Sequence, residues 1–312
     1  MNILITGGLG FIGSNFLELI INNNKFDKIY IIDNNKISIK RYYIPLNLNK
    51  NIKLINHDLL KLEDFKLNLD CIVHLAAAGN VIESTKNPIY NFEHNVRATL
   101  NILEFARKSK VPKFIFSSTG GALMGNNSLP INENSYPKPI SPYGASKLSC
   151  ESYINAYSSM YEIESYILRF GNVYGPYCFH KKGVVNKLLE CTLQKKIFNI
   201  FGDGTSSRDY IYVKDIAKAI LSCVLKDSNS MQNTYHLSTN VETTLNELIK
   251  IFTKITDTKI DINYFPERIG EVYRNFADYN LANKELSFEP NKDLESLLED
   301  TFRWYKNYLY NA

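Results

Sequence analysis

The sequence predicts an α/β protein with a doubly wound parallel sheet and a smaller C-terminal α/β domain. Three observations support this fold class. Up to about residue 175, short apolar runs alternate with helical patterns, which is typical of parallel strands joined by crossover helices. A glycine-rich turn follows the first apolar run, and the second run ends in an acidic residue, as in Rossmann-type dinucleotide-binding domains. After Pro176 shorter strands separate the helices, so we expect a second domain to begin there.

Seven apolar runs have the length and composition of buried strands. Six of them precede residue 175, and the seventh, at residues 233–237, is expected to return to the same sheet. The six are residues 2–6, 28–32, 53–56, 71–75, 113–117 and 164–170. Helical patterns start at residue 12 and cover residues 88–108 and 143–161. We therefore assign residues 1–175 to a cofactor-binding domain, completed by a strand near residues 233–238.

The second half of the chain, residues 176–312, is expected to form most of a substrate domain. Its predicted helices cover residues 184–195, 214–226, 244–256 and 294–308, and its predicted strands cover residues 197–201, 209–213 and 261–265. Because the returning strand lies within this half, the boundary between the two domains is not a single cut.

Length and composition allow a large core and disfavour several classes of protein. The chain has 312 residues, of which 45% are hydrophobic, and a net charge of +4. Since Lys and Arg form no dense run, we expect neither nucleic acid nor a membrane surface as a partner. The five cysteines are scattered and lack a C-x-x-C pair, which predicts reduced thiols and no metal site. With no signal peptide and no apolar run of bilayer length, a cytoplasmic location is expected.

The turn after the first strand has the chemistry of a dinucleotide-binding site. Gly7, Gly10 and Gly13 permit a tight turn and let backbone N–H groups approach a pyrophosphate. Asp33 ends the second strand roughly 20 residues after Gly13, which is the offset of the acid that bonds the adenosine ribose hydroxyls. Because a carboxylate there repels a 2′-phosphate, we predict NAD rather than NADP as the cofactor.

Other polar residues near the predicted strand ends each have two interpretations. Asp58 either accepts a hydrogen bond from the adenine amine or caps the next turn. Asn95, on the helix after the fourth strand, either faces the nicotinamide or is a solvated helix position. The small residues at positions 76–79 suit a cofactor that lies across the edge of the sheet.

Thr119, Tyr143 and Lys147 are the candidate catalytic residues. Thr119 closes a Ser-Ser-Thr run at the end of the fifth strand, and Tyr143 and Lys147 share one face of the following helix. The nearby ammonium favours the charged form of the phenol, whose reference pKa is about 10, so Tyr143 is expected to act as a base closer to neutral pH. The pattern predicts removal of a proton from a substrate hydroxyl while a nicotinamide accepts the hydride.

Taken together, these motifs resemble the extended short-chain dehydrogenase/reductase family, and within it the nucleotide-sugar 4-epimerases of the UDP-glucose 4-epimerase type. The resemblance covers nearly the whole chain. Its marks are Gly7-x-x-Gly10-x-x-Gly13, Asp33-Asn34, Asp58-Leu59, His74-Leu75-Ala76-Ala77, Asn95, Ser117-Ser118-Thr119, Tyr143-x-x-x-Lys147, the run from Arg169 to Pro176, the run from Phe201 to Gly204 and the run from Arg208 to Val213.

The resemblance implies a role for each matching position. Tyr143 would be the base, Lys147 would bind the nicotinamide ribose and tune Tyr143, and Thr119 would bond the reacting sugar hydroxyl. The implied cofactor-binding residues are Gly7, Gly10, Phe11, Ile12, Gly13, Asp33, Asn34, Asp58, Leu59, Leu75, Ala76, Ala77, Asn95, Ser117, Tyr143 and Lys147. The implied substrate-binding residues are Thr119, Asn172, Val185, Arg208 and Arg268.

Further expectations follow from the same resemblance. Residues 176–312 would form most of the site for a nucleotide-diphosphate sugar, with Asn172, Arg208 and Arg268 at the diphosphate. Surface ion pairs are the alternative for both arginines. The helices that begin near Pro88 and Tyr143 would form a homodimer. Met124 stands where a tyrosine is common in the family, and Asn275 stands where the family gates the C2 substituent of the sugar.

The residues after Thr119 bear on the reaction that follows C4 oxidation. Gly120 and Gly121 stand where dehydratases and decarboxylases carry acids, so return of the hydride, and hence 4-epimerisation, is expected. The alternative is a dehydrogenase that releases a 4-keto sugar, for example from a GDP- or dTDP-linked hexose or heptose. A third possibility, a sugar-nucleotide sensor without activity, would predict an eroded catalytic triad, whereas all three residues are present.

Overall fold

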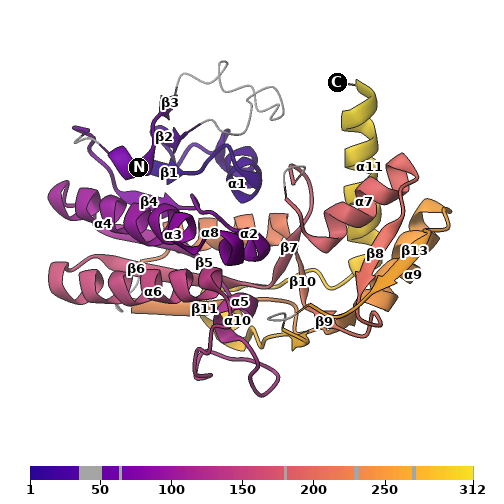
Figure 1. Ribbon diagram of the computed structural model, residues 1–312. Coiled ribbons are helices and arrows are strands. Elements are labelled where there is room, and N and C mark those ends of the chain that lie inside the picture. Colours follow the sequence, from indigo (N-terminus) through magenta and orange to yellow (C-terminus); the bar gives the residue numbers. More distant parts are fainter. Residues whose placement is uncertain (35–50, 63–64, 179–180, 228–231, 269–271, 312) are drawn as a thin grey trace.

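The computed structural model describes residues 1–34, 51–62, 65–178, 181–227, 232–268 and 272–311. A seven-stranded parallel sheet forms the centre of the first domain, in the order β11-β6-β5-β4-β1-β2-β3 (Figure 1). The strands are β1 (Asn2–Thr6), β2 (Lys28–Asp33), β3 (Ile52–Asn56), β4 (Cys71–His74), β5 (Lys113–Thr119), β6 (Glu164–Phe170) and β11 (Gln232–Leu237).

The direction of winding reverses between β1 and β4, which are neighbours in the sheet. From β1 the chain builds outward through β2 and β3, and from β4 it builds the other way through β5, β6 and β11. In open α/β sheets, ligands bind outside the carboxyl ends of the strands at such a reversal. The doubly wound fold class predicted from the sequence is confirmed.

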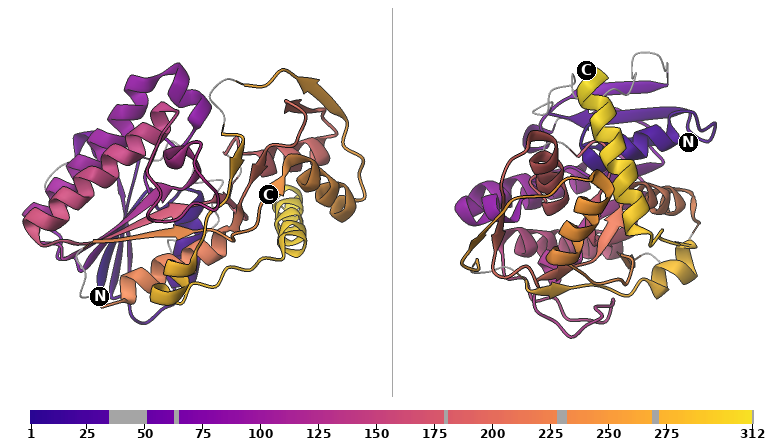
Figure 2. Two further views of the ribbon diagram at one scale, coloured as in Figure 1. Left: turned by 90° about the horizontal axis from the view of Figure 1, so that it is seen from below. Right: turned by 90° about the vertical axis from the view of Figure 1, so that its right-hand side faces the viewer.

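Helices cover both faces of this sheet, and Figure 2 shows the two helix layers on opposite sides of the strands. Along β1, Ile3 and Ile5 enter the core on one face, whereas Leu4 enters the core on the other. Burial on both faces explains why these strands appear as continuous apolar runs. One layer holds α1 (Phe11–Ile20), α8 (Val213–Leu225) and α10 (Asn280–Leu286), and the other holds α4 (Ala98–Lys108) and α6 (Pro142–Tyr161).

The helix expected at residues 88–108 is helical throughout but not uniform. It begins as α3 (Pro88–Phe92), whose first turn is capped by Asn87, and it continues as α4 after a π-helical turn at Glu93–Arg97. Such wide turns are rare and are often found at functional sites. Here the turn holds Asn95, one of the predicted cofactor residues.

The second half of the chain builds its own core around aromatic and aliphatic side chains of three helices, which lie to the right in Figure 1. These helices are α7 (Val184–Gln194), α9 (Leu245–Thr256) and α11 (Leu294–Asn311). The strand pairs are β8 (Phe198–Phe201) with β13 (Ile262–Phe265), and β7 (Asn172–Tyr174) with β10 (Tyr210–Tyr212). A third small sheet joins β9 (Ser207–Arg208) to β12 (Thr243–Thr244) and β14 (Arg274–Asn275).

Several short elements have no counterpart in the sequence prediction. They are α2 (Val81–Lys86), α5 (Gly121–Met124) and the single turn Leu59–Lys61. Each is too short for a helical period to stand out in the sequence. Within the residues that the structure describes, no helix combines the length and the apolar character that crossing a bilayer requires.

Candidate active site

β5 and α6 bring two of the candidate catalytic residues to the same end of the sheet. Thr119 is the last residue of β5 and pairs with Phe170, the last residue of β6. A Cβ at Gly144 would lie only 2.1 Å from the carbonyl oxygen of Ala122. Because Gly144 allows this close approach, the first turn of α6, which carries Tyr143, packs against the segment that follows Thr119.

The start of α6 is fixed by side chains around Tyr143. Ser141 caps the helix by accepting a hydrogen bond from the backbone N–H of Gly144 at 3.2 Å. The backbone N–H of Tyr143 donates to the Ser84 hydroxyl of α2, also at 3.2 Å. The Tyr143 hydroxyl oxygen lies 4.0 Å from the point that a Cβ of Gly79 would occupy. It therefore borders the loop after β4, where the sequence predicts the cofactor.

Lys147 is buried one turn further along α6. Its Nζ donates a hydrogen bond of 2.7 Å to the carbonyl oxygen of Ser117 and lies 4.4 Å from the ring centre of Phe116. The hydroxyl of Ser117 in turn donates to the carbonyl oxygen of His74 at 3.1 Å. These bonds tie α6 to the ends of β5 and β4, two residues before Thr119.

The protonation of Tyr143 differs from the sequence prediction. Burial raises the pKa of Tyr143 to about 12, and burial lowers the pKa of Lys147 to about 8. The expectation that the nearby ammonium brings the phenol closer to neutral pH is therefore wrong in its direction, because loss of solvation disfavours the charged form of both groups.

A buried ion pair lies beneath these residues and links three elements. Glu151, one turn beyond Lys147, accepts hydrogen bonds from Nε and Nη2 of Arg169 in β6 at 3.1 and 2.7 Å. It also accepts the hydroxyl proton of Ser118 in β5. Because β5, β6 and α6 carry Thr119, Phe170 and Tyr143, this carboxylate fixes the relative position of their ends.

The turn between β1 and α1 has the close packing that a dinucleotide requires. Gly7 has a φ of +66°, and a Cβ there would lie 2.7 Å from the Cα of Ala76. A Cβ at Gly13 would lie 2.5 Å from the carbonyl oxygen of Gly7. No described side chain caps the first turn of α1, so its N–H groups suit a phosphate. Asp33 lies beside this turn, where its carboxylate accepts the backbone N–H of Leu9 at 3.1 Å.

For Asp58 and Asn95 the sequence left two interpretations each, and their protein contacts bear on this choice. The Asp58 carboxylate caps the turn Leu59–Lys61 by accepting the N–H of Leu60 at 3.0 Å. Asn95 is buried rather than solvated, and its amide accepts the N–H of Ala78 at 2.8 Å and donates to the Ser146 hydroxyl at 2.9 Å. Asn95 therefore holds the loop after β4 against α6.

The remaining predicted cofactor residues lie around the same edge of the sheet. Phe11 is buried and Ile12 is partly buried at the start of α1, and Asn34 is exposed directly after β2. Ala76 donates its N–H to the Thr6 hydroxyl at 3.4 Å, and Ala77 beside it is exposed. Leu59 is buried in the core below β3, and Leu75 is half-buried.

Gly120 and Gly121 have little free space around them. Gly120 has φ −76° and ψ −47°, an ordinary helical conformation. A Cβ at Gly120 would lie 3.3 Å from the carbonyl oxygen of Phe170, and one at Gly121 would lie 3.3 Å from Oδ1 of Asn275, so a side chain at either position would press on its neighbour. Met124, just beyond, is fully buried in a small apolar cluster.

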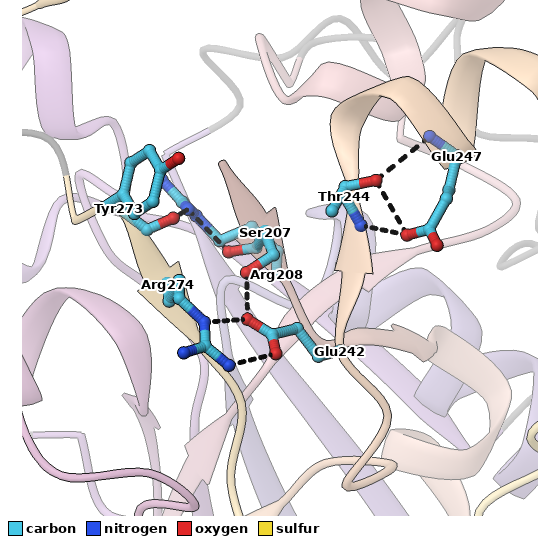
Figure 3. A network of polar contacts seen from close by, with 7 residues as sticks. All are labelled: Ser207, Arg208, Glu242, Thr244, Glu247, Tyr273 and Arg274. Carbon is cyan, nitrogen blue, oxygen red and sulfur yellow. Dashed lines mark hydrogen bonds and ion pairs between the residues drawn. The ribbon is translucent and has the colours of Figure 1, made fainter. Parts of the chain in front are cut away.

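The predicted substrate residues of the second half line a different set of strands. Nη1 of Arg208 bridges the carbonyl oxygens of Ser207 and Tyr273 at 2.7 and 3.2 Å (Figure 3). Arg268 lies 3.5 Å above the ring centre of Phe201.

Asn172 and Val185 complete the predicted substrate set. Asn172 begins β7, pairs with Tyr210 and donates its N–H to the carbonyl oxygen of Asp209 at 2.7 Å. Val185 is buried in the core of the second half. Arg274, which lies close to Arg208 in Figure 3, forms an ion pair with Glu242. Its Nε and Nη2 donate to the two carboxylate oxygens of Glu242 at 2.7 and 2.6 Å.

Comparisons with known proteins agree with this arrangement. The model of the NAD-dependent epimerase/dehydratase family matches residues 3–237 of the chain. The chain belongs to this family. It is 38% identical to a putative UDP-glucose 4-epimerase from Methanocaldococcus jannaschii, over 98% of both proteins.

Solved structures of family members share the whole fold. A UDP-glucose 4-epimerase from Thermotoga maritima, crystallised with UDP-glucose, superposes with a TM-score of 0.91 at 35% identity, over 99% of this chain and 100% of the other. A UDP-glucuronic acid 4-epimerase from Bacillus cereus, in complex with UDP-glucuronic acid and NAD, superposes with a TM-score of 0.90 at 28% identity, over 98% and 99% of the two chains. The resemblance drawn from the sequence motifs is confirmed at the level of the family.

The sequence analysis assigned no role to three polar residues that lie near the candidate active site. Glu151 and Arg169 form the buried pair, and Lys181 lies beside Gly79, next to the region that the Tyr143 hydroxyl also borders. The spacing of Glu151, four residues after Lys147, was a signal that it shares a helix face with the candidate base. No spacing rule relates Lys181 to Tyr143, because they come from different segments that only the fold brings together.

Proposed function

We propose that this protein is an NAD-dependent nucleotide-sugar 4-epimerase of the UDP-glucose type. The observation that carries the proposal is the junction of β4, β5 and α6. There the Tyr143 hydroxyl borders the loop after β4, Lys147 is bonded to Ser117, and the two residues after Thr119 are glycines. This arrangement supplies a base and a hydroxyl partner for a sugar alcohol, without an acid next to Thr119 for elimination.

Each residue of the triad has a proposed task. Tyr143 takes the proton of the C4 hydroxyl, Thr119 bonds the reacting oxygen and Lys147 holds the ribose and the charge of the phenolate. When bound, NAD would supply a reversible hydride acceptor at C4, and the hydride would come back to the other face of the 4-keto sugar. Reprotonation of the oxygen by Tyr143 then yields the C4 epimer, so neither protons nor electrons are consumed overall.

The proposed cofactor site uses the close-packed turn of residues 7–13. Phosphate oxygens would accept N–H groups of the first turn of α1, and the Asp33 carboxylate would bond the adenosine ribose. The contacts of Gly7 and Gly13 support this fit, because a side chain at either position would clash with the backbone that forms the turn. Asn95 would act on the cofactor through the loop at Ala78, and Asp58 would cap the turn beside the adenine.

The proposed substrate site lies between the domain of residues 1–175, with its returning strand, and the domain formed mainly by residues 176–312. Arg208 and Arg268 would bind the nucleotide diphosphate, because a guanidinium presents a planar fork to phosphate oxygens. Asn172 and Val185 would lie along the bound sugar nucleotide. Asn275, buried opposite Gly121, would limit the size of the group at C2 of the sugar.

We also propose that the protein is a cytoplasmic homodimer. Support comes from apolar side chains on the outer faces of α3 and α6: Ile89 is 75% exposed, Phe92 53%, Tyr153 43% and Met160 73%. Apolar patches of this kind are typical of protein interfaces. Pairing of α3 and α6 with the same helices of a second copy would cover them.

A panel of nucleotide sugars tests the proposed reaction. Purified protein is incubated with UDP-, GDP- and dTDP-linked hexoses, the sugars are followed by NMR and free NADH by absorbance. Interconversion of C4 epimers without NADH accumulation is expected for a UDP-hexose. Accumulation of NADH in proportion to a 4-keto sugar would instead identify a dehydrogenase, and conversion of no sugar in the panel would contradict the proposal.

A further inference from the structure

Lys181, in the segment before α7, directs its ammonium group toward the same point as the Tyr143 hydroxyl. A Cβ at Gly79 would lie 3.6 Å from Nζ of Lys181 and 4.0 Å from the hydroxyl oxygen of Tyr143. The two polar atoms therefore border one small region beside the loop after β4. None of the motifs that mark the family in this sequence includes this lysine.

The backbone around Lys181 is fixed from two sides. Its N–H donates to the carbonyl oxygen of Cys178 at 3.0 Å, and its carbonyl oxygen accepts a hydrogen bond of 2.9 Å from the buried amide of Asn186 in α7. The next residue, Lys182, forms an ion pair of 3.2 Å with Glu83 of α2. The two adjacent lysines thus have different surroundings: Lys182 pairs with an exposed carboxylate, and Lys181 reaches toward Tyr143.

The Lys181 ammonium has no counter-ion among the residues that the structure describes. Its Nζ makes no hydrogen bond or ion pair with these residues. The residue as a whole is exposed, but enough protein surrounds the amine to lower its pKa. A partly desolvated cation without a partner is unfavourable unless a negative group comes to lie beside it. Of the two groups at this point, the Tyr143 hydroxyl is the one that becomes negative during the proposed reaction.

We infer that Lys181 is a positioning residue for the base: its ammonium, together with that of Lys147, stabilises the phenolate of Tyr143. The inference rests on the proposed function, since it assigns Tyr143 the role of base. Burial raises the pKa of Tyr143 to about 12, and a cation that borders the same region favours the charged form of the phenol.

The other charged or titratable groups around Tyr143 supply only part of this positive charge. Lys147 and Cys150 lie on the same helix, and Lys147 is already bonded to the carbonyl oxygen of Ser117. Glu83 comes from α2, which packs on the start of α6, but its carboxylate is paired with Lys182. The electrostatic influence of Lys181 on this region is seen in Lys147, whose pKa it lowers further by like-charge repulsion.

A titration of Tyr143 itself tests the inference without relying on turnover. The protein is saturated with NAD and labelled with ¹³C at the tyrosine ring carbon that carries the hydroxyl, and the Tyr143 signal is assigned by its loss in Tyr143→Phe. We compare wild type with Lys181→Met, which keeps the apolar stem, and with Lys181→Arg, which keeps the charge. Lys182→Met is the matched control, because it removes the adjacent positive charge. As a second readout, the acidic limb of kcat/KM against pH is measured for the same four proteins.

We expect the pKa of Tyr143 and the acidic limb to move to higher pH by roughly one unit in Lys181→Met, and to stay near the wild-type values in Lys181→Arg and Lys182→Met. Unchanged values in Lys181→Met would overturn the inference. It would also be overturned if the Tyr143 pKa stayed constant while only the KM of an acidic sugar rose, since Lys181 would then recognise the substrate. Failure of the proposed epimerisation is a separate outcome, because the NMR titration needs no substrate.

Discussion

Tyr143 shows how far the chemistry of a residue depends on its surroundings. Its spacing from Lys147 was visible in the sequence, and so was its place after a Ser-Ser-Thr run. The direction of its pKa shift could not be predicted from the sequence, because desolvation depends on how completely the folded chain encloses the hydroxyl. The same holds for Lys181, whose proximity to Tyr143 arises from segments about 40 residues apart. Residue types and short spacings were thus predictable, and electrostatics across segments was not.

Replacing Tyr143 by Phe removes only the hydroxyl of the proposed base. We expect turnover to fall by about 10²–10⁴, which is the typical contribution of a general base, while NAD still binds. Steady-state kinetics measure the first effect and calorimetric titration with NAD the second. Tyr136→Phe, at a tyrosine that is 75% exposed in the loop before α6, is the matched control and should retain wild-type turnover. Near-normal turnover in Tyr143→Phe would rule out its role as base.

At the level of elements, the buried Glu151–Arg169 ion pair holds α6, β5 and β6 together. The two side chains are 5% and 9% exposed, so their charges are almost fully removed from water. A buried pair of this kind adds little net stability, but the loss of one partner leaves an uncompensated charge. Strand and helix positions could be predicted from apolar periodicity. The ion pair could not, because it depends on the tertiary pairing of polar residues.

Replacing Glu151 by Gln should therefore destabilise the protein strongly. We expect the free energy of unfolding to fall by about 3–5 kcal/mol, because Arg169 is left buried without its partner. Denaturant unfolding measures this change, and the double variant Glu151→Gln with Arg169→Met should recover part of it. Arg303→Ala, which breaks an exposed pair with Glu299, is the control and should cost under about 1 kcal/mol. Equal effects for the buried and exposed pairs would contradict this account.

At the scale of the whole molecule, the order of the seven strands determines where the site lies. Apolar runs and the glycine turn were sufficient to predict a doubly wound parallel sheet and its returning strand, but not the strand order that puts the reversal next to β1. The short strands β7, β9, β12 and β14 escaped prediction, because two or three residues carry no periodicity. These strands hold Asn172, Arg208 and Asn275, so the sequence named these residues of the proposed substrate site without predicting the elements that position them.

Two buried histidines make the stability of the fold depend on pH. Burial lowers the pKa of His74 and of His236 to about 3, so both are neutral in the folded state over most of the acidic range. In the unfolded chain they bind protons below a pKa of about 6.5. The unfolded state therefore binds more protons between these values, and stability that is complete above pH about 6.5 is lost as the pH falls toward 3.

His236→Leu tests this contribution, because neither ring nitrogen of His236 has a hydrogen-bond partner among the described residues. The variant should reduce the slope of unfolding free energy against pH by about 1.4 kcal/mol per pH unit between pH about 3 and 6.5. Urea unfolding at a series of pH values measures the slope. An unchanged slope would show that His236 does not titrate on unfolding.

The fate of the hydrogen at C4 tests the central claim most directly. A UDP-hexose deuterated at C4 is incubated with the protein in ordinary water, and the product is examined by NMR and mass spectrometry. If Tyr143 acts beside a nicotinamide that takes and returns the same hydride, the C4 epimer should form with its deuterium retained at C4 and without free NADH. Loss of the deuterium to solvent, or its appearance in released cofactor, would contradict the account.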